Sequence, residues 1–491
     1  MSRPLRVAIV HYHLKRGGVT RVIESTLRGF EQEPTAPQCV VLAGQVPNDF
    51  SHASLARCVP GLRYSNDQEA TPAPQELLEQ LRTAAEDTLG APPDIWHIHN
   101  HSLGKNSSVP GLISLLAQEG ARMLLHMHDF AEDGRPENYK LNQLEKTYSD
   151  HLYPDMDTVH YGVLNARDHA IYKATGIPDA RLHLLGNPVE SSLHPERDKE
   201  AESIRKSLNA RKLYLYPVRA VRRKNFGELL YWAALAEPGD VFITTLGPTN
   251  KNFVEAYERW KNLAQKWNLP VEFSVAEQHD WPFESIMAAA DQVISTSIAE
   301  GFGLAFLEPW LFNKGITGRD LPSITQDFKE HGITLHQCYQ ALPVPKSWVD
   351  STLLSQYIQK ALQVSYEAYE TKLPDDALNC AIAAITPMDG YYDFGGLNED
   401  LQESVIEKLV KDRDAKEALP VAELPPPLQA EQIDRNARRI EKSYSLSGYC
   451  DRILSIYQVL ENSSPGKAAF LNAKTVLKGF LSPERLRLLR T

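Results

Sequence analysis

Short apolar segments alternate with helical patterns along much of this 491-residue chain, and this alternation limits the folds open to it. The first apolar segment, Val7–Val10, is short enough for a strand buried on both faces. Gly17 and Gly18 follow it, and apolar residues then recur at helical spacing, as in Val22, Ile23 and Leu27. Strand, glycine-rich turn and helix in succession open a βαβ unit. Repetition of this unit predicts a parallel sheet with helices on both faces.

The alternation occurs in two series, which predicts two similar α/β domains. The expected strands of the first series cover residues 7–10, 40–42, 95–98, 123–128 and 159–164. Those of the second series cover residues 214–218, 241–246, 271–275 and 292–296. After about residue 390 the pattern becomes helical and charged, and the run 425–427, which is three prolines, interrupts it as an extended connector.

Composition restricts the classes of function. Lys and Arg number 52 against 63 for Asp and Glu, a net charge of −11, which argues against a broad basic face and a nucleic-acid partner. Five scattered cysteines without a CxxC pair argue against disulfides and a thiolate zinc site, and indicate a reducing, cytoplasmic location. No apolar run reaches the ~18 residues of a membrane span. Peripheral membrane contact and the oligomeric state stay open.

Histidines gather at the ends of three expected strands. They are His11, His13, His97, His99, His101, His126 and His128. The carboxyl ends of strands line the ligand crevice of an open α/β sheet, so these imidazoles suggest a polar cleft that takes protons or binds anions. A metal site is the sharper alternative, which the absence of a neighbouring thiolate or HExxH pattern disfavours. The simpler alternative is a set of structural histidines that satisfy one another.

Two basic segments follow the first expected strand of each series. Lys15 precedes Gly17 and Gly18, where glycines allow close backbone approach and a helix start offers free N–H groups to an anion. Arg219 and Lys224 lie five residues apart after the strand at 214–218 and suit a diphosphate. The alternatives are an ordinary tight turn in the first case and a solvated basic turn in the second.

The segment Ser297–Glu308 is the most specific feature of the chain. Gly301 and Gly303 mark a turn after the expected strand at 292–296, and an apolar helix is expected to start there. We expect Glu300 in the loop and Glu308 about a turn and a half into that helix. Free N–H groups at the helix start would then hold a diphosphate without a metal. Glu308 would accept hydrogen bonds from a diol, and Glu300 would reach toward a sugar.

These motifs resemble, in order, those of the retaining glycosyltransferases of the GT-B fold, family 4, and more distantly of glycogen synthase. The family's Glu-x7-Glu motif matches Ser297–Glu308, its Arg-x4-Lys pair matches Arg219 and Lys224, its glycine loop matches Gly17 and Gly18, its HD dipeptide matches His128 and Asp129, and its N-P-V segment matches Asn187–Val189. The resemblance implies an α/β fold of the GT-B type, with two facing Rossmann-like domains, parallel sheets and a helical C-terminal extension.

The expected domains follow from this resemblance. An N-terminal acceptor domain covers residues 1–190, and a C-terminal nucleotide-sugar donor domain covers residues 191–446, with an insertion near 330–440. Helices at 447–491 are expected to cross back to the N-terminal domain.

The resemblance also implies an enzyme, a retaining hexosyltransferase that forms an α-glycoside without a metal. Its co-substrate would be a UDP-, GDP- or ADP-hexose, with no other cofactor. Arg219 and Lys224 would neutralise the departing diphosphate, Glu300 would hold the sugar, and His128 would lie beside it. The expected donor-binding residues are Gly17, Gly18, Arg219, Lys224, Gly301, Phe302, Gly303, Leu304 and, on the ribose, Glu308.

The acceptor is expected to be a small molecule or glycoside, and the basic residues hint at an anionic or phosphorylated one. The residues expected to bind it are Lys15, Arg16, His99, His101, Lys105 and Asp129. The chain departs from the family after Glu308, so the donor base, the sugar and the acceptor stay open. The DxD triplets at 155–157 and 412–414 are short matches that we interpret as structural. Two alternatives remain, a glycoside phosphorylase on the same fold and a non-catalytic sugar-nucleotide-binding protein.

Overall fold

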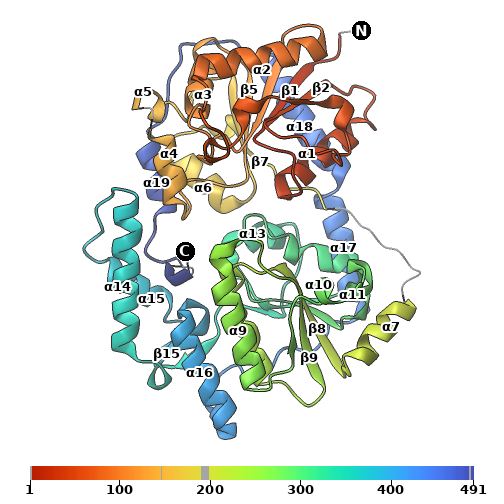
Figure 1. The fold of residues 1–491 in the computed structure, drawn as a ribbon, viewed down its shortest axis with the longest axis vertical. Helices are drawn as coiled ribbons and strands as arrows, with labels where there is room; N and C mark the ends of the chain where they lie inside the picture. The colour runs from red at the N-terminus through yellow and green to blue at the C-terminus, as the bar shows by residue number, and fades with distance from the viewer. Residues whose placement is uncertain (1–2, 145, 190–197, 486–487, 491) are drawn as a thin grey trace. The chain divides into compact units, whose positions relative to one another are not determined.

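A computed structural model describes residues 3–144, 146–189, 198–485 and 488–490 of the chain. The chain divides into two compact units, shown as a ribbon in Figure 1. Unit 1 comprises Met1–Pro188, Ala368–Glu370 and Tyr444–Ser482, and unit 2 comprises Val189–Glu367, Thr371–Ser443 and Pro483–Thr491. Each unit is described by itself.

Unit 1 contains a seven-stranded sheet in the order β3-β2-β1-β4-β5-β6-β7, with parallel pairing throughout. Its strands are β1 (Arg6–His11), β2 (Gln38–Ala43), β3 (Ala56–Cys58), β4 (Ile95–His99), β5 (Met123–Met127), β6 (Val159–Val163) and β7 (Leu182–Leu184). In the centre, Ile9 of β1 lies beside Val41 of β2 and His97 of β4. The expected strands of the first series are thus confirmed.

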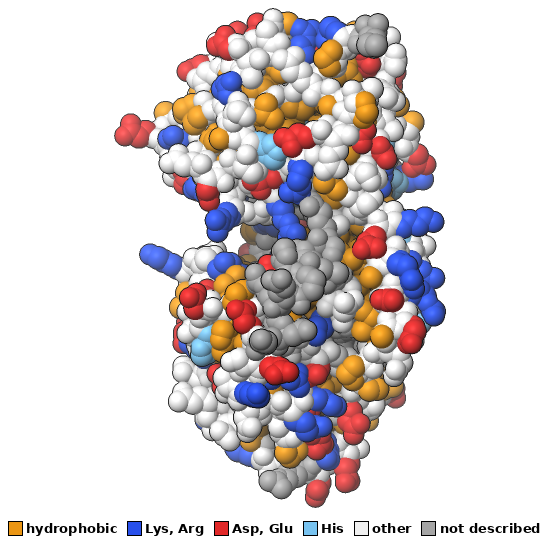
Figure 2. Space-filling model, turned by 90° about the vertical axis from the view of Figure 1, so that its right-hand side faces the viewer, with side chains coloured by type: hydrophobic (Ala, Val, Ile, Leu, Met, Phe, Trp, Pro, Cys, Tyr) orange, Lys and Arg blue, Asp and Glu red, His pale blue; other side chains and the backbone are white. Residues whose placement is uncertain are grey.

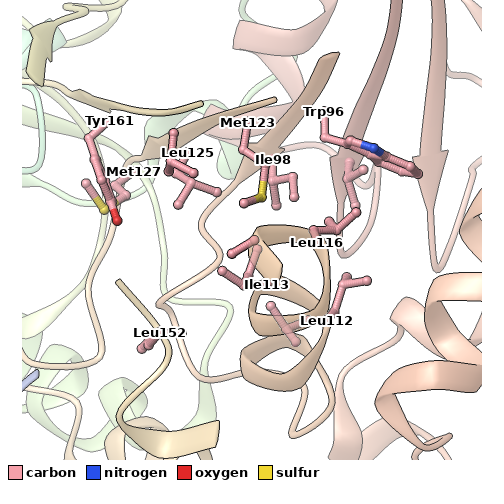
Figure 3. Close-up of a cluster of buried hydrophobic side chains, with 14 of the residues drawn as sticks. Trp96, Ile98, Leu112, Ile113, Leu116, Met123, Leu125, Met127, Leu152 and Tyr161 are labelled. Carbon is pink, nitrogen blue, oxygen red and sulfur yellow. The ribbon is translucent and has the colours of Figure 1, made fainter. Parts of the chain in front are cut away.

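The two faces of this sheet bury separate cores, as the continuous apolar strands predict. Val7 and Ile9 of β1 pack on one face with α1 (Gly18–Phe30) and α18 (Leu446–Glu461). Ala8 and Val10 pack on the other face with α2 (Pro74–Leu89), α3 (Val109–Gln118) and α19 (Ala473–Phe480). Figure 3 shows part of this second core, where strand residues such as Ile98 and Leu125 face Ile113 and Leu116.

The other helices of unit 1 are short. They are α4 (Pro136–Asn142), α5 (Lys146–Ser149) and α6 (Ala166–Ala174). In α18, Tyr449, Ile453 and Tyr457 are buried in the core that contains Val7. Residues far apart in the sequence therefore build one hydrophobic core, and the fold of unit 1 includes chain from beyond residue 443.

Unit 2 contains a six-stranded sheet in the order β10-β9-β8-β11-β12-β13, again with parallel pairs. Its strands are β8 (Lys212–Arg219), β9 (Asp240–Leu246), β10 (Val271–Glu272), β11 (Gln292–Ser295), β12 (Ile316–Arg319) and β13 (Cys338–Tyr339). A separate antiparallel pair joins β14 (Pro343–Pro345) and β15 (Tyr391–Asp393). Two parallel sheets with helices confirm the α/β class.

The helices of unit 2 include α14 to α17, which lie in the segment near 330–440 that the sequence left unassigned. They are α7 (Asp198–Ser207), α8 (Phe226–Ala234), α9 (Val254–Lys266), α10 (Val275–Gln278), α11 (Phe283–Ala289), α12 (Glu308–Leu311), α13 (Pro322–Glu330), α14 (Ser351–Ala368), α15 (Ala377–Ala384), α16 (Glu399–Lys411) and α17 (Ala430–Ser443). Among the described residues, no helix is both long enough and apolar enough to cross a membrane. On the face in Figure 2, acidic and basic side chains are intermixed, in keeping with the net charge of −11.

Candidate functional site

Unit 2 holds a basic turn at the carboxyl end of β8. Residues Arg222–Lys224 form a single 3-10 turn that ends at Asn225, whose φ of 54° lies in the left-handed region. The carbonyl of Lys224 accepts hydrogen bonds from Tyr216 Oη and Thr296 Oγ1, each at 3.0 Å, and the carbonyl of Arg223 accepts one from Ile298 N at 2.9 Å. These bonds fix the turn against the loop that follows β11.

Glu300 is the carboxylate that this turn surrounds. Its Oε2 accepts a hydrogen bond from Arg223 Nη1 at 2.7 Å, and its Oε1 pairs with Lys224 Nζ. The Glu300 side chain is only 8% exposed and that of Lys224 only 11%. Burial alone would raise the pKa of Glu300, but Lys224 and Arg223 outweigh it and lower this pKa to about 2. Glu300 is therefore an ionised, positioned acceptor of hydrogen bonds.

The two residues of the expected diphosphate pair differ in environment. Lys224 is buried beside Glu300, and burial lowers the pKa of its ammonium although Glu300 acts in the opposite direction. Arg219, the last residue of β8, is exposed, and its Nη1 lies 3.4 Å from the carbonyl of Gly247. Sequence reasoning missed Arg223, the second cation on Glu300. Its position next to Lys224 in the same turn was the only available signal.

The glycine turn before Glu308 is tightly packed. Gly303 has a φ of 92°, and a Cβ atom there would lie 2.8 Å from Ile324 Cγ2. Phe302 is buried with its ring edge-on to Phe328, at 5.6 Å between centroids. Gly303 is thus required both by its backbone conformation and by the lack of space.

The helix expected after Gly303 is shorter than predicted. Residues Leu304–Phe306 form a 3-10 turn, and α12 begins only at Glu308, so the placement of Glu308 a turn and a half into a helix was wrong. Pro309 is the physical reason, because it lacks an N–H group and its ring clashes with the carbonyl four residues earlier. A four-residue helix is also too short to supply a strong dipole, so the expected anion site at this helix start loses its main support. Glu308 is partly exposed.

In unit 1 the glycine loop opens the first helix. Gly17 is fully extended (φ 178°), and a Cβ atom on Gly18 would meet nothing within 4 Å. Thr20 Oγ1 donates to the carbonyl of Lys15 at 2.7 Å, which fixes the loop. Among the described residues no side chain caps α1, and Lys15 and Arg16 are exposed. The loop therefore offers open space beside uncapped N–H groups.

Asn100 organises the ends of the central strands of unit 1. It follows β4 with a φ of 56°, and its Oδ1 accepts hydrogen bonds from His128 N at 2.7 Å and Asp129 N at 3.1 Å. Its carbonyl accepts one from Tyr12 Oη at 3.1 Å. Sequence reasoning missed Asn100, although an Asn directly after a strand tolerates the left-handed conformation.

Most of the strand-end histidines are buried rather than presented to solvent. His99 is 2% exposed and its Nδ1 lies 2.9 Å from His128 Nε2, while His101 is 1% exposed and its Nε2 lies 3.1 Å from the carbonyl of Leu152. Burial lowers the pKa of each of them, that of His101 to about 3. The expected proton-accepting cleft at His99 and His101 is therefore corrected, since neutral buried rings supply no charge to an anion. His99 and His128 contact each other, as the simpler interpretation requires, but His99 Nε2, His101 Nδ1 and His126 Nε2 are buried without a hydrogen-bond partner among the described residues.

Ring stacking also bears on the metal alternative. One nitrogen each of His97, His99 and His126 lies within 4.8 Å of the others. The rings of His97 and His99 are stacked at 4.4 Å, and His97 Nε2 is 3.2 Å from His126 Nδ1. Imidazole lone pairs lie in the ring plane, so stacked rings direct them along separate planes instead of at one ion.

The first DxD triplet has a structural partner, because Asp155 pairs with Arg181.

Lys105, which follows β4, makes no ion pair with a carboxylate among the residues that the structure describes. Lys105 Nζ is 5.3 Å from the centroid of the Tyr64 ring, and Tyr64 Oη is 3.1 Å from His13 Nε2. Burial and then Arg135 lower the pKa of Lys105, while Asp129, which pairs with Arg135, acts in the opposite direction. Of the expected acceptor residues, the structure thus brings Lys105 and Asp129 into one electrostatic neighbourhood.

No protein family model matches the chain. Mannosylglucosyl-3-phosphoglycerate synthase of Petrotoga mobilis is 26% identical over 345 residues, which cover 65% of this chain. The match spans 66% of the length of that curated relative.

Solved structures show the same fold. The HepE protein of Anabaena, solved with UDP and glucose, superposes with a TM-score of 0.52 at 11% identity, covering 92% of this chain and 99% of that one. The N-terminal domain of trehalose-6-phosphate phosphatase of Candida albicans gives a TM-score of 0.53 at 10% identity, covering 93% and 97%. At such identities the likeness concerns the fold, and it confirms the expected resemblance in architecture to the GT-B proteins.

Proposed function

We propose that this GT-B-fold chain is a retaining glycosyltransferase that moves a hexose from a nucleotide sugar to a small anionic acceptor. One observation carries the proposal: Glu300 is buried, ionised and held by Lys224 and Arg223 at the carboxyl edge of the unit 2 sheet. Ligands of open α/β sheets bind at that edge. The curated relative, a synthase of a glycosylated phosphoglycerate by its name, and HepE, solved with UDP, support the same class of chemistry.

The donor would be held by charge and by hydrogen bonds. Lys224 would share its ammonium between Glu300 and the diphosphate, and exposed Arg219 would add a guanidinium to the same leaving group. Glu300 would accept hydrogen bonds from hydroxyls of the donor sugar. Stabilisation of the departing diphosphate and of the positive charge that develops on the sugar carbon would lower the barrier. Attack by the acceptor hydroxyl from the face of the leaving group would give an α-glycoside.

Binding of a nucleoside diphosphate tests the donor half of the proposal. Wild-type protein titrated calorimetrically with UDP, GDP and ADP is expected to bind at least one of them. Lys224→Ala is expected to weaken that binding by about tenfold or more, since one close charge contact contributes on the order of 1.5–3 kcal/mol. Arg259→Ala removes a surface ion pair with Glu403 in the same unit and serves as the matched control. Equal affinities in wild type and Lys224→Ala would reject the assigned role.

An anionic acceptor is the finer part of the proposal. Lys105 supports it, because its half-buried ammonium contacts an aromatic ring while its nearest charges include both Arg135 and Asp129. The name of the curated relative contains a phosphoglycerate, which is an anion of the expected size. Lys105→Gln is expected to raise the KM for a 3-phosphoglycerate-containing acceptor without changing the KM for the donor. An unchanged KM for that anionic acceptor in Lys105→Gln would contradict it.

A further inference from the structure

Arg490 is buried in unit 2, where it contacts Asn225 at the end of the basic turn. It is 5% exposed, its Nη1 donates to Asn225 Oδ1, and its Nη2 donates to the carbonyl of Leu397. The backbone of the same segment is also engaged, because Arg222 Nη2 lies 3.3 Å from the carbonyl of Leu489. The segment Leu488–Arg490 is therefore joined to the Arg222–Asn225 turn by both side chain and main chain.

Asn225 is the residue through which this contact reaches Lys224. It follows Lys224 directly and adopts a φ of 54°, in the left-handed region that Asn tolerates better than most residues with a side chain. Its Nδ2 donates to Glu228 Oε2 at 2.8 Å, and its Oδ1 accepts from Gln402 Nε2 at 3.0 Å as well as from Arg490. Four partners, counting Thr296 on its carbonyl, thus hold Asn225 in this state.

Arg490 lies near carboxylates that surround Asn225: burial lowers the pKa of its guanidinium to about 10, whereas Glu399 and Glu228 act in the opposite direction. Glu228 and Asp393 both contact Arg319, which is fully buried, and Glu399 contacts Arg222. These groups are three carboxylates and two guanidiniums, so Arg490 supplies the third positive charge. Removing one partner from a buried set of charges leaves an uncompensated charge, which favours rearrangement of the groups around it. The side-chain amide of Asn225 contacts the groups affected by that change, since it hydrogen-bonds both Glu228 and Arg490.

We propose that Arg490 is a positioning residue for the donor site: by holding Asn225 in the left-handed conformation, it places Lys224 against Glu300 for the diphosphate. This inference rests on the proposed function, because it assigns Arg490 to the same site. Within the described part of the chain, Arg490 hydrogen-bonds Asn225 and Leu397 and neither Lys224 nor Glu300. It acts through the side-chain amide of Asn225, so the effect of substituting Arg490 on donor binding is expected to depend on that amide.

A double-mutant cycle tests the route. Arg490→Gln removes the positive charge and the guanidinium that donates to two partners. Asn225→Gly keeps the left-handed backbone but removes the side-chain amide that Arg490 contacts. Affinity for UDP, GDP and ADP is measured calorimetrically at a temperature where circular dichroism shows each variant folded. Arg490→Gln is expected to weaken binding about fivefold to tenfold, in the range typical of coupling between sites. In the Asn225→Gly background the same substitution is expected to change the affinity less than twofold.

Two further variants separate positioning from stability. Arg490→Lys keeps the charge without the fork and is expected to recover part of the affinity, whereas a purely structural role would change only the melting temperature. Arg259→Gln, on a surface ion pair of unit 2, controls for loss of an arginine. Wild-type affinity in Arg490→Gln, or full additivity in the cycle, would overturn the inference while leaving the proposed function intact. Failure of wild-type protein to bind any of the three nucleotides would reject the proposed function itself, and this inference with it.

Discussion

Glu300 is the residue on which the proposed chemistry depends most. Its charge is maintained by two cations from one turn, and this arrangement requires that the Arg222–Asn225 turn and the loop after β11 fold against each other. The sequence motif predicted that Glu300 and Lys224 belong to one site. It did not predict Arg223 as a partner, because three consecutive basic residues look alike in sequence and only the turn geometry distinguishes them.

Glu300→Gln is expected to reduce the transfer rate by about 10²–10³-fold, the range seen when a positioned electrostatic group is removed. The amide keeps the shape of the side chain but loses the charge that pairs with Lys224. Steady-state kinetics with the donor checks the expectation. Glu403→Gln, which changes a partly exposed carboxylate of the Arg259 ion pair, is the control and is expected to leave the rate unchanged. A Glu300→Gln enzyme with wild-type turnover would exclude a role for this carboxylate in the reaction.

Gly303→Ala is expected to lower the free energy of unfolding by about 2–4 kcal/mol, adding a left-handed backbone penalty to overpacking. The new methyl group would lie 2.8 Å from Ile324 Cγ2 and 3.2 Å from Phe306 Cδ2. Urea unfolding measures the change. Gly18→Ala is the comparison, because its methyl group meets nothing within 4 Å and its stability effect is expected within about 0.5 kcal/mol. Equal effects of the two substitutions would contradict the packing described for Gly303.

At the scale of elements, the sequence predicted the central strands well, but it extended the strand at 271–275, which ends at Glu272, and it extended one helix. Continuous apolar runs such as Val7–Val10 indicate strands whose two faces are both covered, and alternate residues of β1 do face separate cores. The sequence predicted too long a helix after Gly303. The glycine and the apolar residues favoured a helix start there, and the effect of Pro309 was not taken into account. For the histidines, burial favours the structural interpretation over the polar cleft, and the sequence could not decide between them because burial depends on chain from elsewhere, such as Tyr457 of α18 on His97.

The buried histidines of β4 and β5 are expected to make the free energy of unfolding depend on pH in the acidic range. Burial lowers the pKa of His126 to about 3, against an ordinary value of 6.5 in the unfolded chain, so the unfolded state binds more protons below pH 6.5. The free energy of unfolding therefore falls as the pH drops below about 6.5, by about 1.4 kcal/mol per pH unit for each such histidine.

His126→Gln is expected to make the free energy of unfolding less dependent on pH, because it removes the contribution of one histidine. Urea unfolding at pH 6.5, 6.0 and 5.5 measures this change in slope. Exposed His336 provides the matched control, and His336→Gln is expected to leave the slope unchanged. A slope that His126→Gln leaves as steep as in wild type would show that His126 takes up its proton in the folded state.

At the scale of the whole molecule, the fold class could be predicted and the segment near 330–440 could not. Two βα series predict two parallel sheets, because this pattern repeats a local rule at every strand. The residues from α13 to α17 follow no such repeat, and their contacts with α8 and the basic turn depend on pairs distant in sequence, such as Glu399 with Arg222. The buried triad of Glu228, Arg319 and Asp393 is equally non-local.

Removal of divalent metals is expected to leave transfer unchanged. Lys224, Arg219 and Arg223 supply positive charge near the proposed diphosphate, which is the service a metal would otherwise perform. Enzyme dialysed against EDTA and assayed with and without added Mg²⁺ or Mn²⁺ provides the measurement. Loss of activity that either metal restores would show that these side chains do not suffice.

The most direct measurement is transfer itself, followed by mass spectrometry and by the anomeric proton coupling of the product. Purified wild-type protein is incubated with UDP-, GDP- or ADP-hexoses and a 3-phosphoglycerate-containing acceptor. The Lys224→Ala protein is assayed in parallel under the same conditions. The account predicts release of one nucleoside diphosphate with formation of an α-linked hexoside, and loss of both in Lys224→Ala. Release of a sugar phosphate that depends on inorganic phosphate, or nucleotide binding without transfer to any acceptor, would contradict it.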